Sequence, residues 1–312
     1  MKLIRLVFFP ILLMLLFNSF ALAQSAQPSP RPAATANPLA AGQKLISEGK
    51  LEEAIAFYKK ALQANPTAWD AYLGMGSALD LKGDYEAARQ EIQKGIDTAP
   101  ASGKVRALRA MAVSYAFSGD AKQAGKYEQQ AYDLQFAAND FSGAAGTADE
   151  AARIYLENND LENARLWYAK GHSIALTDPK LSDADKDLWT FRWESAQARI
   201  AARSGNKAEA QQHLAAAKAA IDKGTNPEQA QFVPYLEGYV AFCGGDYPDA
   251  IADLQKANQK DPFILVLLAQ AYEKSGDQTN AMDYYHKVLE IYAHSPTGAF
   301  SRPLAERKVG NS

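Results

Sequence analysis

Residues 70–100 read DAYLGMGSALDLKGDYEAARQEIQKGIDTAP and contain two apolar stripes separated by a break. The first stripe consists of Tyr72, Met75, Gly76 and Leu79, and the second of Ala88, Ile92 and Gly95. This spacing follows the i, i+3, i+4, i+7 rule, which places each stripe on one buried face of a helix. Lys82-Gly83-Asp84 stands between the stripes, and Gly83 suits the left-handed backbone at a helix end. The segment predicts a helix, a tight turn and a second helix, closed by Pro100.

The same pattern stands 34 residues earlier in the chain. The matching positions are Gly42, Gly49, Ala54, Ala61 and Pro66, which align with Gly76, Gly83, Ala88, Gly95 and Pro100. A helix–turn–helix unit of this length with a closing proline is typical of tetratricopeptide repeats. The sequence resembles that family over residues 38–294. The resemblance implies an all-α fold, a right-handed superhelical solenoid of about seven helix–turn–helix repeats.

The same turn marks seven predicted hairpins. Its left-handed position is occupied by Gly49, Gly83, Gly119, Asn159, Gly205, Gly245 and Gly276. Asparagine also tolerates left-handed backbone, so Asn159 fits the series. The match is strongest in the first two and last two repeats. In the sixth repeat Pro234 predicts a kink or a late helix start.

The N-terminal segment predicts export. In residues 1–23, Lys2 and Arg5 precede an apolar run, and Ala21-Leu22-Ala23 has the small-x-small pattern of a signal peptidase site. The alternative is an uncleaved membrane anchor, since the run approaches the length of a span. Residues 24–37 are rich in Pro, Ser and Ala and predict a flexible linker. We expect a periplasmic or secreted protein with no integral membrane span after cleavage.

Charge and cysteine content narrow the function. The net charge is −3, and removal of residues 1–23 changes it to about −5. This balance argues against a nucleic-acid partner, because phosphate binding needs a concentrated basic surface. Cys243 is the only cysteine, so the chain has no intramolecular disulfide. No cofactor is expected, because the sequence lacks a phosphate-binding glycine loop, a nucleophile elbow and a paired-cysteine motif.

One histidine row resembles a metal site. His286, Glu290 and His294 stand at i, i+4, i+8 and would share a helix face. A metal site needs a further ligand and supporting contacts, which the sequence does not supply. We therefore favour a solvated helix face and predict no metal ligand and no catalytic residue. The tail, residues 295–312, predicts a short closing helix on the last repeat.

Stacked repeats present their first helices along one inner face, where this family commonly binds peptides. The candidate partner-binding residues on this face are Arg106, Arg109, Arg153, Arg192, Arg199, Arg203, Tyr235, Tyr239 and Phe242. The arginines suit the carboxylates of an acidic peptide or a chain end; alternatively they are solvated or paired with Asp149 and Glu157. The aromatic residues suit anchoring of a partner; alternatively they pack between repeats.

These observations favour a non-enzymatic scaffold or adaptor that binds a protein or peptide in the bacterial cell envelope through an open groove. Replacing Arg199 and Arg203 with glutamate is expected to weaken binding without lowering thermal stability. The alternatives are a ligand- or metal-binding accessory protein of the periplasm and an enzyme whose residues converge from distant repeats. An enzyme would need a closed pocket with convergent titratable groups.

Overall fold

The computed structural model describes residues 39–310, and within this range every regular element is helical. The predicted signal segment and linker lie outside the described residues. The helices are α1 (Ala40–Ser47), α2 (Leu51–Ala64), α3 (Trp69–Leu81), α4 (Tyr85–Thr98), α5 (Ala101–Phe117), α6 (Ala121–Ala137), α7 (Phe141–Glu157), α8 (Leu161–Ala175), α9 (Asp183–Arg203), α10 (Lys207–Asp222), the 3₁₀ helix η1 (Pro227–Phe232), α11 (Val233–Gly244), α12 (Tyr247–Leu254), α13 (Pro262–Ser275), α14 (Gln278–Leu289) and α15 (Pro296–Gly310).

The first fourteen α-helices form seven consecutive hairpins, so the predicted solenoid of helix–turn–helix repeats is confirmed. Each hairpin turns at a residue with positive φ, between 62° at Asn159 and 89° at Gly276. In most hairpins the residue after the turn is an aspartate or asparagine that caps the second helix, and the helix begins at the following residue. Asp84, for example, accepts a hydrogen bond from the Ala87 amide at 3.3 Å. Turn and cap together explain why Gly-Asp recurs at four of the seven breaks.

Small residues set the distance between the two helices of a hairpin. The alanine five positions after each turn has no exposed surface in any of the seven repeats: Ala54, Ala88, Ala124, Ala164, Ala210, Ala250 and Ala281. At Gly76 an added Cβ would lie 2.4 Å from Ile92 Cγ1, so α3 and α4 approach too closely for a side chain there. The recurring small residues therefore position the helices that carry the inner face.

The middle repeats depart from the sequence pattern in two ways. α7 lacks large apolar residues in several core positions, and buried alanines such as Ala148 and Ala151 fill them. Asn139, with φ of 57°, makes a second left-handed turn between α6 and α7, which the sequence analysis did not predict. In the sixth repeat Pro234 lies in the first turn of α11, so the prediction of a late helix start is confirmed.

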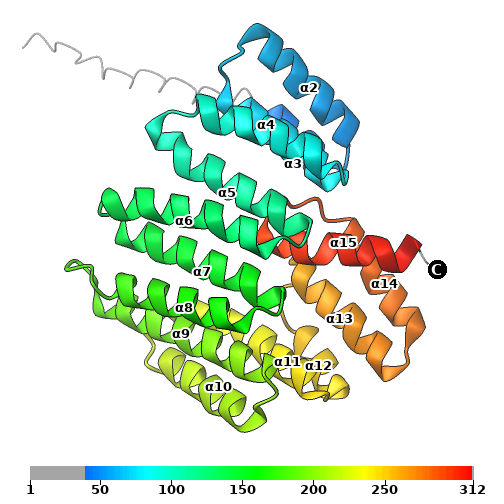
Figure 1. Cartoon of the computed structure of the whole chain (residues 1–312). Helices are drawn as coiled ribbons and strands as arrows, with labels where there is room; N and C mark the ends of the chain where they lie inside the picture. Colours follow the sequence, from blue (N-terminus) through cyan, green and yellow to red (C-terminus); the bar gives the residue numbers. More distant parts are fainter. Residues whose placement is uncertain (1–38, 311–312) are drawn as a thin grey trace, which may run out of the picture. The chain divides into compact units, whose positions relative to one another are not determined.

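The C-terminal helix extends beyond the last repeat. α15 contacts α13 and α14, and it also contacts α5 and α7, beside which it lies in Figure 1. Phe300 of α15 packs edge-on against Phe263 of α13, with ring centroids 6.1 Å apart. Since α5, α7 and α13 are first helices, α15 lies on the inner face and does more than cover the last repeat. The inner face, expected as an open groove, is therefore partly occupied by α15.

Candidate functional site

The predicted partner-binding residues lie on α5, α7, α9 and α11 and line three separate cavities. Arg106 and Arg109 line a cavity of about 840 Å³. Arg203, Tyr239 and Phe242 line a second of about 1020 Å³, and Arg153, Arg192, Arg199 and Tyr235 line a third of about 340 Å³. The nine side chains thus face the inner side of the solenoid, but they do not form one continuous surface.

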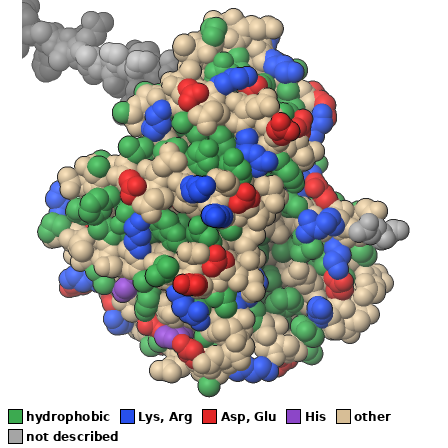
Figure 2. Space-filling model, viewed as in Figure 1, with side chains coloured by type: hydrophobic (Ala, Val, Ile, Leu, Met, Phe, Trp, Pro, Cys, Tyr) green, Lys and Arg blue, Asp and Glu red, His purple; other side chains and the backbone are tan. Residues whose placement is uncertain are grey.

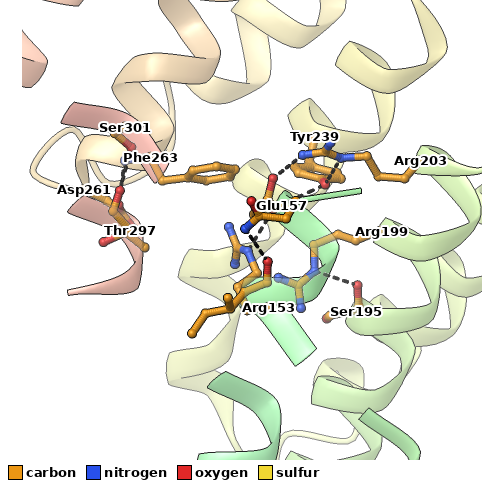
Figure 3. A network of polar contacts seen from close by, with 12 residues as sticks. Arg153, Glu157, Ser195, Arg199, Arg203, Tyr239, Asp261, Phe263, Thr297 and Ser301 are labelled. Atoms are coloured by element: carbon orange, nitrogen blue, oxygen red, sulfur yellow. Dashed lines mark hydrogen bonds and ion pairs between the residues drawn. The ribbon is translucent and has the colours of Figure 1, made fainter. Parts of the chain in front are cut away.

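Glu157 connects three of the inner helices (Figure 3). Its Oε1 lies 3.0 Å from Arg153 Nε on α7, and its Oε2 accepts a hydrogen bond from Arg203 Nη2 on α9. Arg203 Nε also donates to Tyr239 Oη on α11 at 2.7 Å. The Glu157 side chain is only 4 % exposed. Arg203 is therefore bound inside the protein, which changes the expectation that its replacement leaves stability unaffected.

Two of the aromatic candidates pack against other aromatic rings of the solenoid. Tyr239 has no exposed surface, and its ring lies 6.4 Å from that of Phe263 on α13. Phe242 packs against Tyr247 with ring centroids 6.1 Å apart. Tyr239 is therefore corrected from a partner-binding residue to a core residue. Tyr235 also contacts Phe263, with ring centroids 6.3 Å apart, but it remains partly exposed and lines the 340 Å³ cavity.

That cavity is lined by Asp149, Tyr168, Arg192, Ser195, Arg199 and Tyr235, among others, and we call these six residues the Arg199 pocket. Among residues 39–310 neither Arg192 nor Arg199 has an ion-pair partner. Arg199 Nε donates to the Ser195 carbonyl at 3.1 Å, and its guanidinium lies over the Tyr168 ring, 5.5 Å from the centroid. These contacts hold Arg199 in place without neutralising its charge.

Three hydroxyl groups of the Arg199 pocket are buried and unpartnered. Within the described chain, Tyr168 Oη, Ser195 Oγ and Tyr235 Oη have no hydrogen-bond partner. The Tyr168 residue is 4 % exposed. Burial raises the pKa of the Tyr168 phenol to about 12, so it keeps its proton and remains a donor near neutral pH. Buried polar groups are nearly always hydrogen-bonded, so three such hydroxyls in one cavity call for an explanation.

Asp149 is the acidic member of the Arg199 pocket. Burial raises the pKa of its carboxyl to about 6, although Arg192 and Arg199 oppose the change. The neighbouring carboxylate of Glu150, which also lines the cavity, is paired with Arg109 of α5. The pocket therefore contains two unpaired guanidinium groups and one weakly acidic carboxyl.

A second polar cluster involves the segment between α14 and α15. His294 Nε2 lies 2.8 Å from Asp80 Oδ2, and Ser114 Oγ donates to Asp80 Oδ1 at 2.8 Å. α14 ends at Leu289, so His294 does not continue the helix face of His286 and Glu290. The three residues do not come together as a metal site. Within the described range no group of three His, Cys, Asp or Glu side chains is arranged to hold a metal ion.

Charge on the surface is mixed. Figure 2 shows Lys and Arg side chains interspersed with Asp and Glu on the viewed face. Burial raises the pKa of the half-buried Cys243 thiol to about 11, which leaves little reactive thiolate near neutral pH. No helix within residues 39–310 combines the length and apolar character needed to cross a bilayer.

Comparison with known proteins agrees with the repeat architecture. Family models described as tetratricopeptide repeat match residues 45–112 and 235–296. The chain belongs to the tetratricopeptide-repeat family. The matched segments cover the first two and last two tetratricopeptide repeats, where the sequence pattern is strongest. Repeats of this family form protein–protein interaction scaffolds and are generally not catalytic, and the matches support an interaction scaffold for this chain.

Relatives with known names resemble only parts of the chain or its fold. Cellulose synthase operon protein C of Escherichia coli K12 is 30% identical over 135 residues, which are 42% of this chain and 10% of that protein. A tetratricopeptide repeat protein from Parabacteroides merdae superposes with a TM-score of 0.50 at 14% identity, covering 88% of this chain and 96% of the other. The apo form of RapI gives 0.53 at 14% identity, covering 88% and 98%. These two structures support the tetratricopeptide-repeat fold alone.

The sequence analysis missed several members of the Arg199 pocket. Tyr168 lies on α8, a second helix, and Ser195 lies one turn before Arg199 on α9. Neither residue breaks the repeat pattern, so no local signal marks them. Asp149 was expected on the inner face and considered as a partner for the arginines, but its burial was not foreseeable without the packing of α7 against α8 and α9.

Proposed function

We propose that this chain is a non-enzymatic scaffold that binds a protein or peptide partner in the bacterial cell envelope, in the assembly or maturation of an envelope complex. The observation that carries the proposal is the Arg199 pocket. Its two unpaired arginines and three buried, unpartnered hydroxyls belong to residues that line a cavity on the inner side of a repeat scaffold, where a bound chain would lie. Charged and hydrogen-bonding groups that have no partner inside the protein are available to bind a ligand.

The envelope part of the proposal depends on the sequence. Residues 1–23 have the charge, apolar run and small-residue pattern of a secretory signal. The absence of enzymatic function is proposed from the chemistry of the inner face. Three of its acidic groups are influenced by arginines: Glu150 and Glu157 form ion pairs with arginine, and Asp149 interacts with Arg192 and Arg199.

Chemical cross-linking in intact cells, followed by mass spectrometry of the adducts, tests this proposal. A defined protein partner recovered from the envelope fraction supports it. Exclusive recovery from the cytoplasm contradicts the envelope assignment. Stoichiometric binding of a small molecule or zinc without any protein adduct would favour a ligand- or metal-binding accessory protein instead.

A further inference from the structure

The arginines of the Arg199 pocket differ from three other arginines of the inner face because they have no ion-pair partner in the described part of the chain. Arg153 and Arg203 are bound to Glu157, and Arg109 is bound to Glu150. Arg192 and Arg199 have no such partner within residues 39–310, although Asp149 lies close enough to interact with both. Two positive charges against one negative charge leave an excess of one, in a protein whose net charge is −3. The pocket therefore favours a ligand group with one negative charge.

The donors around this excess charge suit an oxygen ligand. The Arg199 guanidinium is held in place by a hydrogen bond to the Ser195 carbonyl and by its contact with the Tyr168 ring. Tyr168 Oη, Ser195 Oγ and Tyr235 Oη add three hydroxyl donors that the rest of the described chain does not use. Guanidinium and hydroxyl donors recognise a planar carboxylate through several short hydrogen bonds. A doubly charged phosphate fits less well, because Asp149 and Glu150 line the same cavity.

The apolar side of the pocket indicates that the carboxylate belongs to a larger molecule. Phe232 of η1 lines the cavity and is 47 % exposed, and Leu236 and Phe191 complete the wall. An exposed aromatic ring at the rim of a polar cavity suits contact with an apolar portion of the same ligand. The cavity volume of about 340 Å³ accommodates one or two residues of a peptide.

We propose that the Arg199 pocket binds a carboxylate group of the partner polypeptide, with Arg192 and Arg199 neutralising it and Tyr168, Ser195 and Tyr235 donating hydrogen bonds. This inference rests on the proposed function and adds the chemical group that the scaffold recognises. The carboxylate comes from a chain terminus or from an acidic side chain, and both share the same recognition chemistry.

The direct test is titration of the purified full chain, labelled with ¹⁵N-arginine, with sodium propionate and with propionamide. We expect the Arg192 and Arg199 Nε–H resonances to shift saturably with propionate and to remain unchanged with propionamide. Tyr168→Phe should weaken propionate binding about five-fold, since one neutral hydrogen bond is lost. Arg192→Gln should weaken it about ten-fold, since a charged partner is lost. Arg165→Gln, an exposed arginine on α8, serves as the matched control and should leave binding unchanged.

Two further probes distinguish the source of the carboxylate. N-acetylalanine offers only a terminal carboxylate, and the α-amide of N-acetylglutamate offers only a side-chain carboxylate. Tighter binding of one identifies which of the two the pocket accepts. Equal shifts with propionate and propionamide, or unchanged affinity in Tyr168→Phe and Arg192→Gln, would overturn the inference.

Because Tyr168 Oη has no partner within the described chain, Tyr168→Phe should fold with undiminished stability, so weakened binding cannot be attributed to unfolding. The experiments also distinguish a wrong assignment of the carboxylate pocket from a wrong proposed function. A chain that ignores propionate but still cross-links to an envelope protein refutes only the carboxylate pocket. A chain that binds propionate through Arg192 and Arg199 but captures no protein refutes the scaffold.

Discussion

His294 Nε2 lies 2.8 Å from the buried Asp80 Oδ2, although 214 residues separate them in the sequence. The imidazole also stacks on Phe117 of α5, with ring centroids 5.5 Å apart. Asp80 is 1 % exposed and has Ser114 as its other hydrogen-bond donor. This contact attaches the segment before α15 to the second and third repeats, so the last part of the chain is bound to the first.

We expect His294→Ala to lower the free energy of unfolding by about 2–3 kcal/mol, because it leaves the Asp80 carboxylate buried with a single donor. Urea denaturation of the purified chain measures the change. His286→Ala, an exposed histidine on α14, is the control and should have little effect. Equal stabilities of the two variants would show that the Asp80–His294 contact contributes nothing.

Arg203→Glu should lower the free energy of unfolding by about 3 kcal/mol or more. The substitution removes a charge partner of Glu157, which is 4 % exposed, and adds a second carboxylate beside it. The same denaturation experiment on Arg165→Glu should give a change within about 0.5 kcal/mol, since that side chain is exposed. A fully stable Arg203→Glu variant would show that the Arg203–Glu157 ion pair contributes nothing to stability.

Glu128 on α6 should make stability fall as pH rises. It is fully buried, and within the described residues its carboxylate oxygens have no hydrogen-bond partner. Burial raises the pKa of this carboxyl from 4.5 to about 8, and Arg109 offsets only part of the rise. The folded state therefore binds the proton more tightly than the unfolded state, so stability is greatest below pH 4.5 and decreases as pH rises toward 8.

Glu128→Gln removes this titration. At pH 7 the variant should be more stable than the original by about 3 kcal/mol, and near pH 4 the two should be alike. Denaturation at several pH values measures the difference, with Glu86→Gln as an exposed control. A difference that does not change with pH would mean that the pKa of Glu128 is the same in the folded and the unfolded protein.

Much of the fold was predictable because the turn and the helix contacts within each repeat are determined by local sequence features. The left-handed turn at positions such as Gly83 and Asn159, and the alanine five residues later, are local features that packing preserves. The turn at Asn139 was missed, because it joins two repeats and lies outside the hairpin pattern. The closing helix on the last repeat was predicted, but the contacts of α15 with α5 and α7 were missed, since they depend on segments far apart in the sequence, as the contact of His294 with Asp80 does.

The site was predictable only in part. Register along the first helices identified Arg192, Arg199 and Tyr235 as inner-face residues, and the structure has them around one cavity. The same register could not separate Tyr239, which is buried against Phe263, from Tyr235 one turn earlier. Both rings contact Phe263 of α13, but only Tyr239 is fully buried, and that difference depends on the assembled solenoid and not on either helix alone.

Site-specific photo-cross-linking tests the central claim most directly. Phe232 lines the Arg199 pocket and is 47 % exposed, so replacing it with p-benzoylphenylalanine places a reactive aromatic group at the rim with little change in shape. Leu166 on α8 is 62 % exposed, does not line the pocket and receives the same residue as a control. After irradiation of intact cells, we predict a discrete protein adduct from position 232 and none from position 166. No adduct from either position, or the same adducts from both, would contradict a scaffold that binds its partner at the Arg199 pocket.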